Sequence, residues 1–439
     1  MSTAMNDPRP IADQTPPRHQ TLPRPAMCRH CGLLQTIPAL DDSSSASCPR
    51  CHTMLRRTHP DSLNRALAMT MAALSLFGVA CLMPLMSVST AGISLSADLF
   101  TGPERLQQRG IWELALIVLF TTVAAPFLKL LGMAYVLIGL KMSRPPRHLR
   151  RVFGWIERLR AWSMVEVYLL GVFVAYVKLV DIVHIDIGLA LYALGLLILT
   201  TVAADAVLDR QAVWEEMERR GLSDESRGTS ATVMLFEGRH PASCETCGKV
   251  GFLGVGSRPS CSRCGSRLHH RKPNHMARCW ALVIAAIVLY VPANVYPVLT
   301  VVHLGSGAPS TILGGVEELL DAGMYPLAAL VFFASILVPV LKLGGLIILM
   351  ISTQFAWAGR LLDRTRLYRI VSVIGRWSMI DIFMESILVA LVQFGAIATI
   401  EPGFGAISFC GVVILTIFAA EAFDPRSMWD AAASSRTTS

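Results

Sequence analysis

Long apolar segments are the dominant feature of the chain. Windows of about 18 or more mostly apolar residues are long enough to cross the hydrocarbon core of a bilayer as helices. Such windows cover residues 66–87, 111–140, 163–184, 186–207, 279–302, 323–352, 378–400 and 403–422. The pattern predicts an all-α polytopic membrane protein with eight transmembrane helices.

The composition supports this class of protein. Of the 439 residues, 53% are hydrophobic and only 16% are charged, whereas about a quarter of the residues of a soluble domain are charged. The mean hydropathy of the chain is +0.51. These values exclude an ordinary soluble protein.

Basic residues are unevenly distributed between the segments that connect the predicted spans. Lys and Arg number eight before the first span, seven between the second and third, twelve between the fourth and fifth, and five between the sixth and seventh. The connections that alternate with these along the chain carry at most two Lys or Arg residues each. Because positively charged segments stay on the cytoplasmic side, and the first 65 residues lack the apolar core of a signal peptide, both termini are predicted to be cytoplasmic. The net charge of +8 then reflects topology and attraction to anionic lipid rather than nucleic-acid binding.

The apolar pattern repeats about 213 residues further along the chain. Pro126 and Lys129 lie inside the second predicted span, and Pro339 and Lys342 lie at the matching positions of the sixth. A Trp-Ser-Met sequence opens the third span at residue 162 and the seventh at residue 377. Each copy has an even number of spans, so the sequence predicts a tandem duplication of a four-helix unit with parallel topology.

Eight cysteines form two similar arrangements, one before each four-helix unit. They are Cys28, Cys31, Cys48 and Cys51, and then Cys244, Cys247, Cys261 and Cys264. Two CxxC pairs about fifteen residues apart bring four thiolates together as a tetrahedron, which is typical of a zinc ribbon. We therefore expect two structural Zn²⁺ sites on the reducing cytoplasmic side, where disulfides rarely form.

The metal is expected to act as the core of each ribbon. A module of about thirty residues is too small to fold on its own core, whereas zinc binding contributes about 10 to 16 kcal/mol to folding. A rubredoxin-like iron centre, which also uses four thiolates, is the alternative. Four nearby histidines are expected to face solvent, because four thiolates already complete each site. These histidines are His30, His52, His269 and His270.

These features divide the chain into consecutive segments. The predicted segments are a disordered tail at 1–26, a first zinc ribbon at 27–58, a first four-helix unit at 63–208, a linker at 209–240, a second zinc ribbon at 241–270, a second four-helix unit at 275–424 and a disordered tail at 430–439. Both tails have the composition of disordered segments, since they are polar and lack apolar periodicity.

The connections between spans contain two further patterns. Residues 86–97 alternate apolar and small polar side chains, as a half-buried strand does, and 298–304 is a shorter counterpart. Small β elements are therefore predicted on the periplasmic side. Residues 144–160 and 358–376 carry Arg among apolar residues at helical spacing. They are interpreted either as amphipathic helices on the inner membrane surface or as plain positive-inside anchors.

Ionisable side chains inside the predicted spans form the candidate transport site. Each one costs about 2.5 to 3.5 kcal/mol at mid-bilayer, so it normally faces the helix bundle and has a partner. In the second copy Lys342 and Asp381 both lie in the inner half of the membrane. Ser335 lies one heptad from Lys342, and Thr416 lies at a similar depth. We predict a polar network of these four residues, with a Lys342–Asp381 contact.

The first copy contains a different set of ionisable residues. Lys129 and Glu166 occupy the positions that match Lys342 and Asp381. Lys178 and Asp181 lie three residues apart on one face of the third span, and the second copy has no charged counterpart of this pair. The hypothesis of proton or substrate handling stands beside a simpler one, in which these pairs are structural and fix the helix register.

A proline precedes each membrane lysine by three residues. Pro126 and Pro339 each remove one helix hydrogen bond, so a kink or a local opening is predicted one turn before the lysine. A kink beside a buried charge indicates a cavity at that depth.

Motifs of nucleotide-driven or hydrolytic enzymes are absent from the sequence. It contains no glycine-rich phosphate loop, no nucleophile elbow, no His-Glu metal helix and no dinucleotide fingerprint. We therefore expect a protein that is not an enzyme and that does not hydrolyse ATP itself.

The combination of these motifs resembles the paraquat-inducible protein A family of bacterial inner-membrane proteins. The resemblance rests on paired CxxC ribbons, each followed by four spans with Pro-x-x-Lys in the second and Trp-Ser-Met opening the third. It extends over about residues 27 to 430 and includes Phe423-Asp424-Pro425-Arg426 with Trp429. It implies a role in moving phospholipids across the envelope, together with a periplasmic MCE-domain protein that forms a tunnel.

Two other functions remain open from the residues. A proton-coupled transporter of small amphipathic solutes would use the same lysine and carboxylates without a tunnel partner. A redox membrane protein would use the four-cysteine centres with iron in place of zinc.

Overall fold

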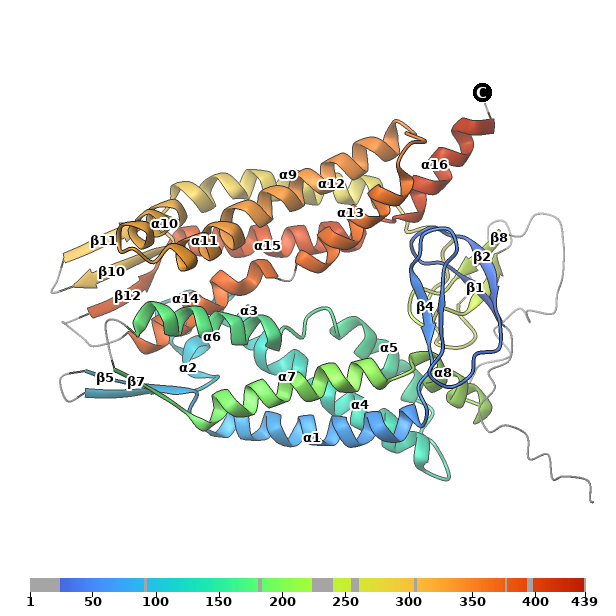
Figure 1. Cartoon of the computed structure of the whole chain (residues 1–439), viewed down its shortest axis with the longest axis horizontal. Helices are drawn as coiled ribbons and strands as arrows, with labels where there is room; N and C mark the ends of the chain where they lie inside the picture. The colour runs from blue at the N-terminus through green and yellow to red at the C-terminus, as the bar shows by residue number, and fades with distance from the viewer. Residues whose placement is uncertain are drawn as a thin grey trace, which may run out of the picture.

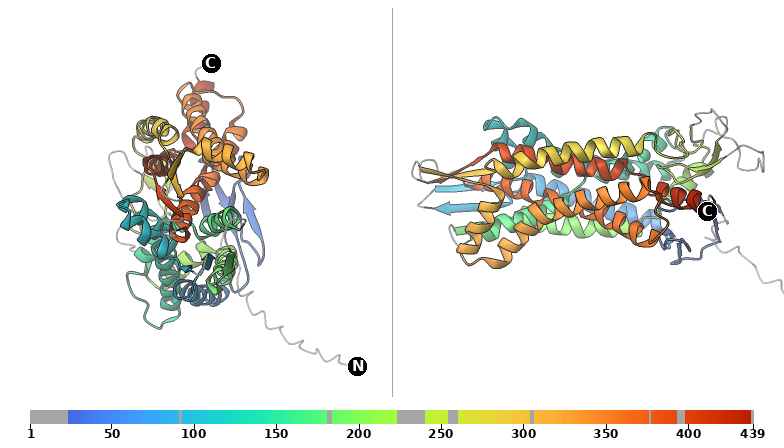
Figure 2. Two further views of the ribbon diagram at one scale, coloured as in Figure 1. Left: turned by 90° about the vertical axis from the view of Figure 1, so that its left-hand side faces the viewer. Right: turned by 90° about the horizontal axis from the view of Figure 1, so that it is seen from above.

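Two helical units lie side by side along the molecule, with small β-sheets at one end and the cysteine-bearing ribbons at the other (Figure 1). We call these the sheet end and the ribbon end. The computed structural model describes residues 24–90, 93–180, 184–222, 240–253, 260–303, 306–375, 377–392 and 398–437. A view from above shows that the long helices run between the two ends (Figure 2).

The same order of helices occurs in both units. The first unit contains α1 (Ser62–Leu82), α2 (Thr101–Gln108), α3 (Trp112–Leu119), α4 (Ala125–Lys141), α5 (Leu149–Leu159), α6 (Val165–Leu179) and α7 (Leu189–Val207). The second contains α9 (His275–Val295), α10 (Ile312–Asp321), α11 (Tyr325–Phe332), α12 (Val338–Gln354), α13 (Leu361–Ile374), α14 (Ile380–Leu391) and α15 (Phe404–Ala422). Helix α8 (Arg210–Arg219) follows the first unit, and α16 (Arg426–Thr437) follows the second.

Six helical stretches within the described residues are long and apolar enough to cross a membrane. They are Ser62–Leu82, Trp112–Lys141, Leu189–Val207, His275–Val295, Tyr325–Gln354 and Phe404–Ala422. The predicted third and seventh spans are not among these six. Their helices are shorter, since α6 has 15 residues and α14 has 12. At 1.5 Å per residue these helices are about 22 Å and 18 Å long, less than the ~30 Å hydrocarbon core. Their apolar windows end in strands rather than in helix.

A three-stranded antiparallel sheet caps each unit at the sheet end. In the first unit β5 (Met86–Thr90) pairs with β6 (Ile93–Ala97) and with β7 (His184–Ile187). In the second unit β10 (Leu299–His303) pairs with β11 (Ser306–Ser310) and with β12 (Ala398–Pro402). The first hairpin and β10 agree with the predicted β elements, whereas β11 lies beyond the segment predicted at 298–304. The third strand of each sheet is missed by the sequence analysis, because it continues an apolar window.

The ribbons are built from short hairpins. In the first ribbon β1 (Arg24–Met27) pairs with β2 (Leu34–Ile37), and β3 (Ser45–Ser47) pairs with β4 (Met54–Arg57). In the second ribbon β8 (His240–Ser243) pairs with β9 (Val250–Leu253). The boundary predicted between the tail at 1–26 and this ribbon is corrected, since β1 begins at Arg24. Residues 1–23 lie outside the described part of the chain.

The predicted disordered tail at 430–439 is also corrected. Helix α16 extends to Thr437 and is anchored by Met428 and Trp429, which are 1% and 6% exposed. The indole nitrogen of Trp429 donates a hydrogen bond of 3.2 Å to Thr365 of α13. An alanine-rich segment favours helix, and these buried side chains hold it against the second unit.

The basic segments predicted at 144–160 and 358–376 form α5 and α13, which pack against the long helix of their own unit. A Cβ placed on Gly132 of α4 would lie 3.0 Å from Ile156 of α5, and one on Gly345 of α12 would lie 2.9 Å from Val371 of α13. These glycines match each other in the two copies. Each helix therefore packs into a glycine position of the preceding long helix.

The two units meet where α6 packs against α14. A Cβ on Gly171 of α6 would lie 2.9 Å from the Cβ of Phe383 and 3.1 Å from the amide nitrogen of Met384. Tyr168 and Phe383 form an edge-to-face aromatic pair with ring centroids 5.6 Å apart. The short third helices of both copies thus form the contact that joins the duplicated halves.

The ribbons are exchanged between the units. The four cysteines of the first ribbon share a buried cluster with residues of the second unit, including Cys279 of α9 and Tyr368 of α13. The four cysteines of the second ribbon share a buried cluster with residues of the first unit, including Val136 of α4 and Phe153 of α5. Each ribbon therefore precedes one unit in the sequence and packs against the other.

Glycines at the sheet end allow a test of the close packing there. A Cβ on Gly403 would lie 2.1 Å from the carbonyl oxygen of Pro297, and its amide already donates a 2.7 Å bond to Val298. Because both neighbours are backbone, Gly403→Ala is expected to lower the free energy of unfolding by about 1 to 3 kcal/mol. Thermal unfolding of the purified protein in detergent measures the change.

Gly195 is the matched control for this prediction. It lies inside α7, and a Cβ placed on it would meet no atom within 4 Å. Gly195→Ala is expected to leave stability unchanged or to raise it by up to about 1 kcal/mol, because alanine favours helix over glycine. Equal melting temperatures for the two variants would contradict the packing described here.

Candidate functional site: two four-cysteine clusters and buried polar groups between helices

Each CxxC pair forms the same turn. The amide of Cys28 donates to the carbonyl of Leu33 at 3.0 Å, and the amide of Gly32 donates to the carbonyl of Cys28 at 2.9 Å. The same two bonds recur at the pairs that begin with Cys48, Cys244 and Cys261. These bonds aim both sulfur atoms of a pair in one direction, as in metal-binding knuckles.

The residue after the second cysteine has a left-handed backbone in all four turns. The φ angles are 73° at Gly32, 73° at Gly248, 76° at Gly265 and 57° at His52. Glycine adopts this conformation without steric cost, which explains three of these residues. Cys-x-x-Cys-Gly is therefore a more informative motif than the cysteine spacing alone.

The four sulfur atoms of each ribbon lie close together. The Sγ atoms of Cys28 and Cys51 are 3.4 Å apart, and those of Cys31 and Cys48 are 3.6 Å apart. In the second ribbon the corresponding distances are 3.4 and 3.5 Å. A tetrahedral zinc site with Zn–S bonds of about 2.3 Å places its sulfurs about 3.8 Å apart. All eight cysteines are at most 6% exposed, so each group can hold one buried metal ion.

The nearby histidines do not all face solvent. His52, His269 and His270 are exposed, as predicted. His30 is half-buried, and its Nδ1 lies 3.0 Å from the hydroxyl of Thr53. Burial and then the positive charge of Arg369 lower the pKa of His30.

Lys342 and Thr416 are brought together, as the sequence predicts. The Nζ atom of Lys342 donates to the hydroxyl of Thr416 at 2.8 Å and lies 3.4 Å from the carbonyl oxygen of Gly375. Lys342 is 2% exposed. No carboxylate in the described part of the chain forms an ion pair with it. The second unit therefore contains a buried lysine whose bonded partners are neutral oxygen atoms.

Asp381 binds Ser335 rather than Lys342. The hydroxyl of Ser335 donates to the Asp381 carboxylate. Ser335 and Lys342 are one heptad apart, which is about 10 Å along a helix, and Asp381 lies in the first turn of α14. The predicted Lys342–Asp381 contact is therefore replaced by two separate polar pairs.

The lysine of the first unit has a different partner from the predicted one. Lys129 forms an ion pair of 2.9 Å with Asp205, which lies in the last turn of α7. Arg160 lies 3.6 Å from the same carboxylate, whereas Glu166 is exposed. The sequence alone does not point to Asp205 as the partner of Lys129. The fourth span of the second copy has alanine at the matching position, so comparison of the two copies gives no signal there.

Lys178 connects the two copies electrostatically. Its charge interacts with the carboxylates of Asp381 and Glu385, both in α14. Glu385 is 3% exposed, and its Oε1 has no hydrogen-bond partner among the described residues. The predicted network omits Glu385. Asp181, which is predicted to pair with Lys178, lies outside the described residues.

A π-helical turn precedes each membrane proline. These turns are η1 (Phe120–Ala124) and η3 (Phe333–Leu337), at matching positions of the two copies. Ser335 lies in η3 and also donates to the carbonyl of Val331 at 2.7 Å, and Thr122 at the matching position donates to Val118 at 2.7 Å. The predicted local opening at Pro126 and Pro339 thus takes the form of a widened helical turn.

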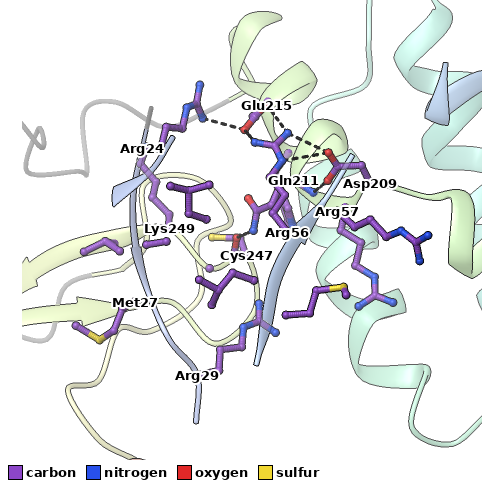
Figure 3. A pocket seen from close by; sticks show the side chains of 18 of the residues that line it. Arg24, Met27, Arg29, Arg56, Arg57, Asp209, Gln211, Glu215, Cys247 and Lys249 are labelled. Atoms are coloured by element: carbon purple, nitrogen blue, oxygen red, sulfur yellow. Dashed lines mark hydrogen bonds and ion pairs between the residues drawn. The ribbon is translucent and has the colours of Figure 1, made fainter. Parts of the chain in front are cut away.

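A cavity of about 910 Å³ lies at the ribbon end, between both ribbons and α8. Arg56 is placed between Asp209 and Glu215 (Figure 3) and bonds both carboxylates at 2.9 to 3.2 Å. Burial alone would raise the pKa of Glu218, but hydrogen bonds from Arg263 and Lys249 outweigh it and lower that pKa. The charges that line this cavity are largely paired with one another.

These features define a multi-pass membrane protein with a duplicated four-helix unit and two buried four-cysteine clusters. The family model described as "Paraquat-inducible protein A" matches residues 63–218 and 276–433. The chain belongs to the paraquat-inducible protein A family.

Several curated proteins are similar over almost their whole length. "Lipophilic envelope-spanning tunnel protein A" of Escherichia coli (strain K12) is 32% identical over 405 residues, which is 92% of this chain and 91% of that protein. "Intermembrane transport protein PqiA" of the same strain is 32% identical over 413 residues, or 94% and 97%. "Probable intermembrane transport protein" of Haemophilus influenzae is 27% identical over 403 residues, or 92% and 95%. No solved structure matches the chain significantly.

Loss of one cysteine cluster is expected to destabilise the unit against which its ribbon packs. Cys28→Ser with Cys31→Ser removes two thiolates of the first ribbon, so amide hydrogen exchange should rise in α13 and stay low in α5. Cys244→Ser with Cys247→Ser should give the reverse pattern. Mass spectrometry of exchange in the full-length protein compares both helices in one sample.

Each double variant should also retain half of the bound metal, measured by elemental analysis. Faster exchange in α5 after removal of the first ribbon's thiolates would contradict the exchanged ribbons. The two double variants serve as controls for each other, because each removes two thiolates from a different ribbon.

Proposed function

We propose that the chain is the inner-membrane component of a lipid transport system. It passes phospholipids between the inner membrane and a periplasmic tunnel of MCE-domain protein, and it thereby supports envelope integrity. Membership of the paraquat-inducible protein A family supports this proposal, as do relatives that are named intermembrane transport and envelope-spanning tunnel proteins. The chain acts as a transporter and not as an enzyme.

The buried lysine of the second unit is the observation that carries the proposal. Lys342 is 2% exposed and bonds Thr416, whereas Lys129 is neutralised by Asp205. A cation without a carboxylate partner is costly within a membrane. It is available for an anionic group, such as the phosphate of a lipid headgroup. The second unit is therefore proposed as the working one, and the first as a scaffold.

We further propose the orientation of the protein in the membrane and the identity of the metal in the two clusters. The ribbon end is cytoplasmic, because the basic segments lie there, and the sheet end is periplasmic, where the MCE partner binds. Both four-cysteine clusters hold structural Zn²⁺, which these residues fit by number, burial and sulfur spacing. Colourless protein with two zinc ions per chain agrees with this assignment, and iron with visible absorbance would favour the redox alternative.

A proton-coupled transporter of small amphipathic solutes is the second candidate function. The observation that favours it is the charge group formed by Lys178, Asp381 and Glu385 across the two units. Buried carboxylates beside a lysine within a membrane are typical of proton relays. A solitary protein that transports solute without an MCE partner would support this candidate.

Lys342→Ala is expected to reduce lipid transport at least tenfold, because the variant removes the buried cation. Asp381→Asn tests the second polar pair in the same assay. Transfer of labelled phospholipid from proteoliposomes to the partner protein measures both effects, and detergent sensitivity of cells reports envelope integrity.

Lys141→Ala is the control, since it removes an exposed lysine at the end of α4. It should keep wild-type transport. Lys129→Ala should have a smaller effect than Lys342→Ala. Wild-type transport by Lys342→Ala and Asp381→Asn together would contradict the proposed site.

Purification in mild detergent is expected to bring down an MCE-domain protein at constant stoichiometry. Lipid mass spectrometry of the complex should find phospholipid above the amount in a control membrane protein of similar size. A partner-free protein with no enriched phospholipid would contradict the proposed function and leave the solute transporter as the better one.

A further inference from the structure

Arg369 of α13 reaches from the second membrane unit into the first ribbon. Its guanidinium donates to the carbonyl oxygen of Cys51 at 2.7 Å and to the hydroxyl of Thr53. The hydroxyl of Thr53 lies 3.1 Å from the sulfur of Cys51. One arginine is thus bonded to the main chain of a cysteine of the cluster and, through a hydroxyl, to its sulfur.

The charge of Arg369 suits a four-thiolate metal site. Four thiolates around a divalent ion carry a net charge of −2, and a neighbouring cation stabilises thiolates. Hydrogen bonds from groups that surround the metal ligands orient those ligands, and their loss typically costs about 10- to 100-fold in metal affinity. Arg369 supplies both effects at the first ribbon.

Further contacts hold the first ribbon against the same helices. The ring of His30 packs edge-on against Tyr368, with centroids 6.0 Å apart. The guanidinium of Arg50 lies 4.2 Å from the ring centre of Trp429 in α16. The ribbon therefore rests on α13 and α16 through several side chains, and Arg369 is the one that reaches its metal ligands.

The far end of α13 approaches Lys342. The carbonyl of Gly375 lies 3.4 Å from the Nζ of Lys342. A Cβ on Gly375 would lie 2.9 Å from the same atom, so a side chain at this position would displace the end of Lys342. Helix α13 thus contacts the first cysteine cluster near its middle and the buried lysine at its C-terminal end.

The helix that packs against the second ribbon has no arginine at the position that matches Arg369. The residue of α5 that matches Arg369 is Gly154, and a Cβ placed there would lie 3.3 Å from a methyl of Thr246. In the second ribbon the residue that matches Thr53 is Ser266, and its hydroxyl lies 3.1 Å from the hydroxyl of Thr246. Glycine at this position of α5 has no side chain that could act as Arg369 does at the first site.

We propose that Arg369 is a positioning residue of the first metal site and couples metal occupancy there to helix α13 and to the carbonyl that faces Lys342. The metal of the first ribbon then stabilises the polar site of the second unit, whereas the metal of the second ribbon does not. The inference rests on metal binding by the clusters and is independent of which substrate is transported.

Zinc release from full-length protein in detergent tests this proposal. With a colorimetric zinc chelator in excess, Arg369→Ala is expected to release one of its two zinc ions at least tenfold faster than wild type. Cysteine alkylation and mass spectrometry should locate the newly reactive thiols at Cys28, Cys31, Cys48 and Cys51. The thiols of the second ribbon should keep their wild-type reactivity and serve as the internal control.

Arg366→Ala is the matched control variant. Arg366 lies in the same helix, is exposed, and is 3.6 Å from Asp363. It should release zinc at the wild-type rate. Arg369→Lys keeps the charge but loses the paired donors, so it should give an intermediate rate and remains informative if the alanine variant does not fold.

Hydrogen exchange with zinc at saturation tests the coupling to Lys342. Both sites are then filled, and Arg369→Ala is still expected to raise exchange in residues 361–375, with no change in α5. Equal acceleration of zinc release from both ribbons, or wild-type release from Arg369→Ala, would overturn the proposal. Lipid transport is not part of this test, so its loss or retention in Arg369→Ala would concern the proposed function only.

Discussion

The burial of eight thiolates at the ribbon end is the constraint on which the rest of the structure depends. Each ribbon is too small to enclose four sulfur atoms with its own side chains, yet all eight cysteines are at most 6% exposed. Membrane helices and α8 supply the missing cover. Because each ribbon packs against the unit that it does not precede in the sequence, the two halves of the duplication cannot separate without exposing a cysteine cluster. The exchanged ribbons and the α6–α14 contact hold the halves together at two different depths.

The duplicated units have diverged in the groups that face their lysines. Lys129 has a carboxylate partner, Asp205, and this pair lies beside a cavity of about 20 Å³, which is enough for one water molecule. Lys342 has a hydroxyl and a carbonyl as partners and is almost fully buried. In the ion pair each group satisfies the other, whereas the buried lysine with neutral partners is the group proposed to bind an anion. The same scaffold therefore supports a structural role in one unit and a proposed transport role in the other.

Local distortions of the helices occur at the same places in both units and have a common cause. Each membrane proline lacks an amide hydrogen, and the turn before it widens to a π-helix whose hydroxyl side chain bonds a carbonyl of the preceding turn. In the second unit the hydroxyl at this position, Ser335, also bonds Asp381. The proline, the widened turn and the polar group are thus parts of one local arrangement, retained in both copies.

The sequence by itself determined the features that depend on local spacing. Of the eight spans predicted from apolar length, six form helices among the described residues that are long enough to cross a membrane. The CxxC spacing identified both clusters, and the periodicity of 213 residues identified the duplication. Tertiary structure decided what depends on contacts between distant segments. Two apolar windows end in strands because β5 and β10 pair with them, Lys129 binds Asp205 rather than Glu166, and Asp381 binds Ser335 rather than Lys342. The exchange of the ribbons rests on contacts between residues far apart in the sequence, such as Arg369 and Cys51, so no local pattern predicts it.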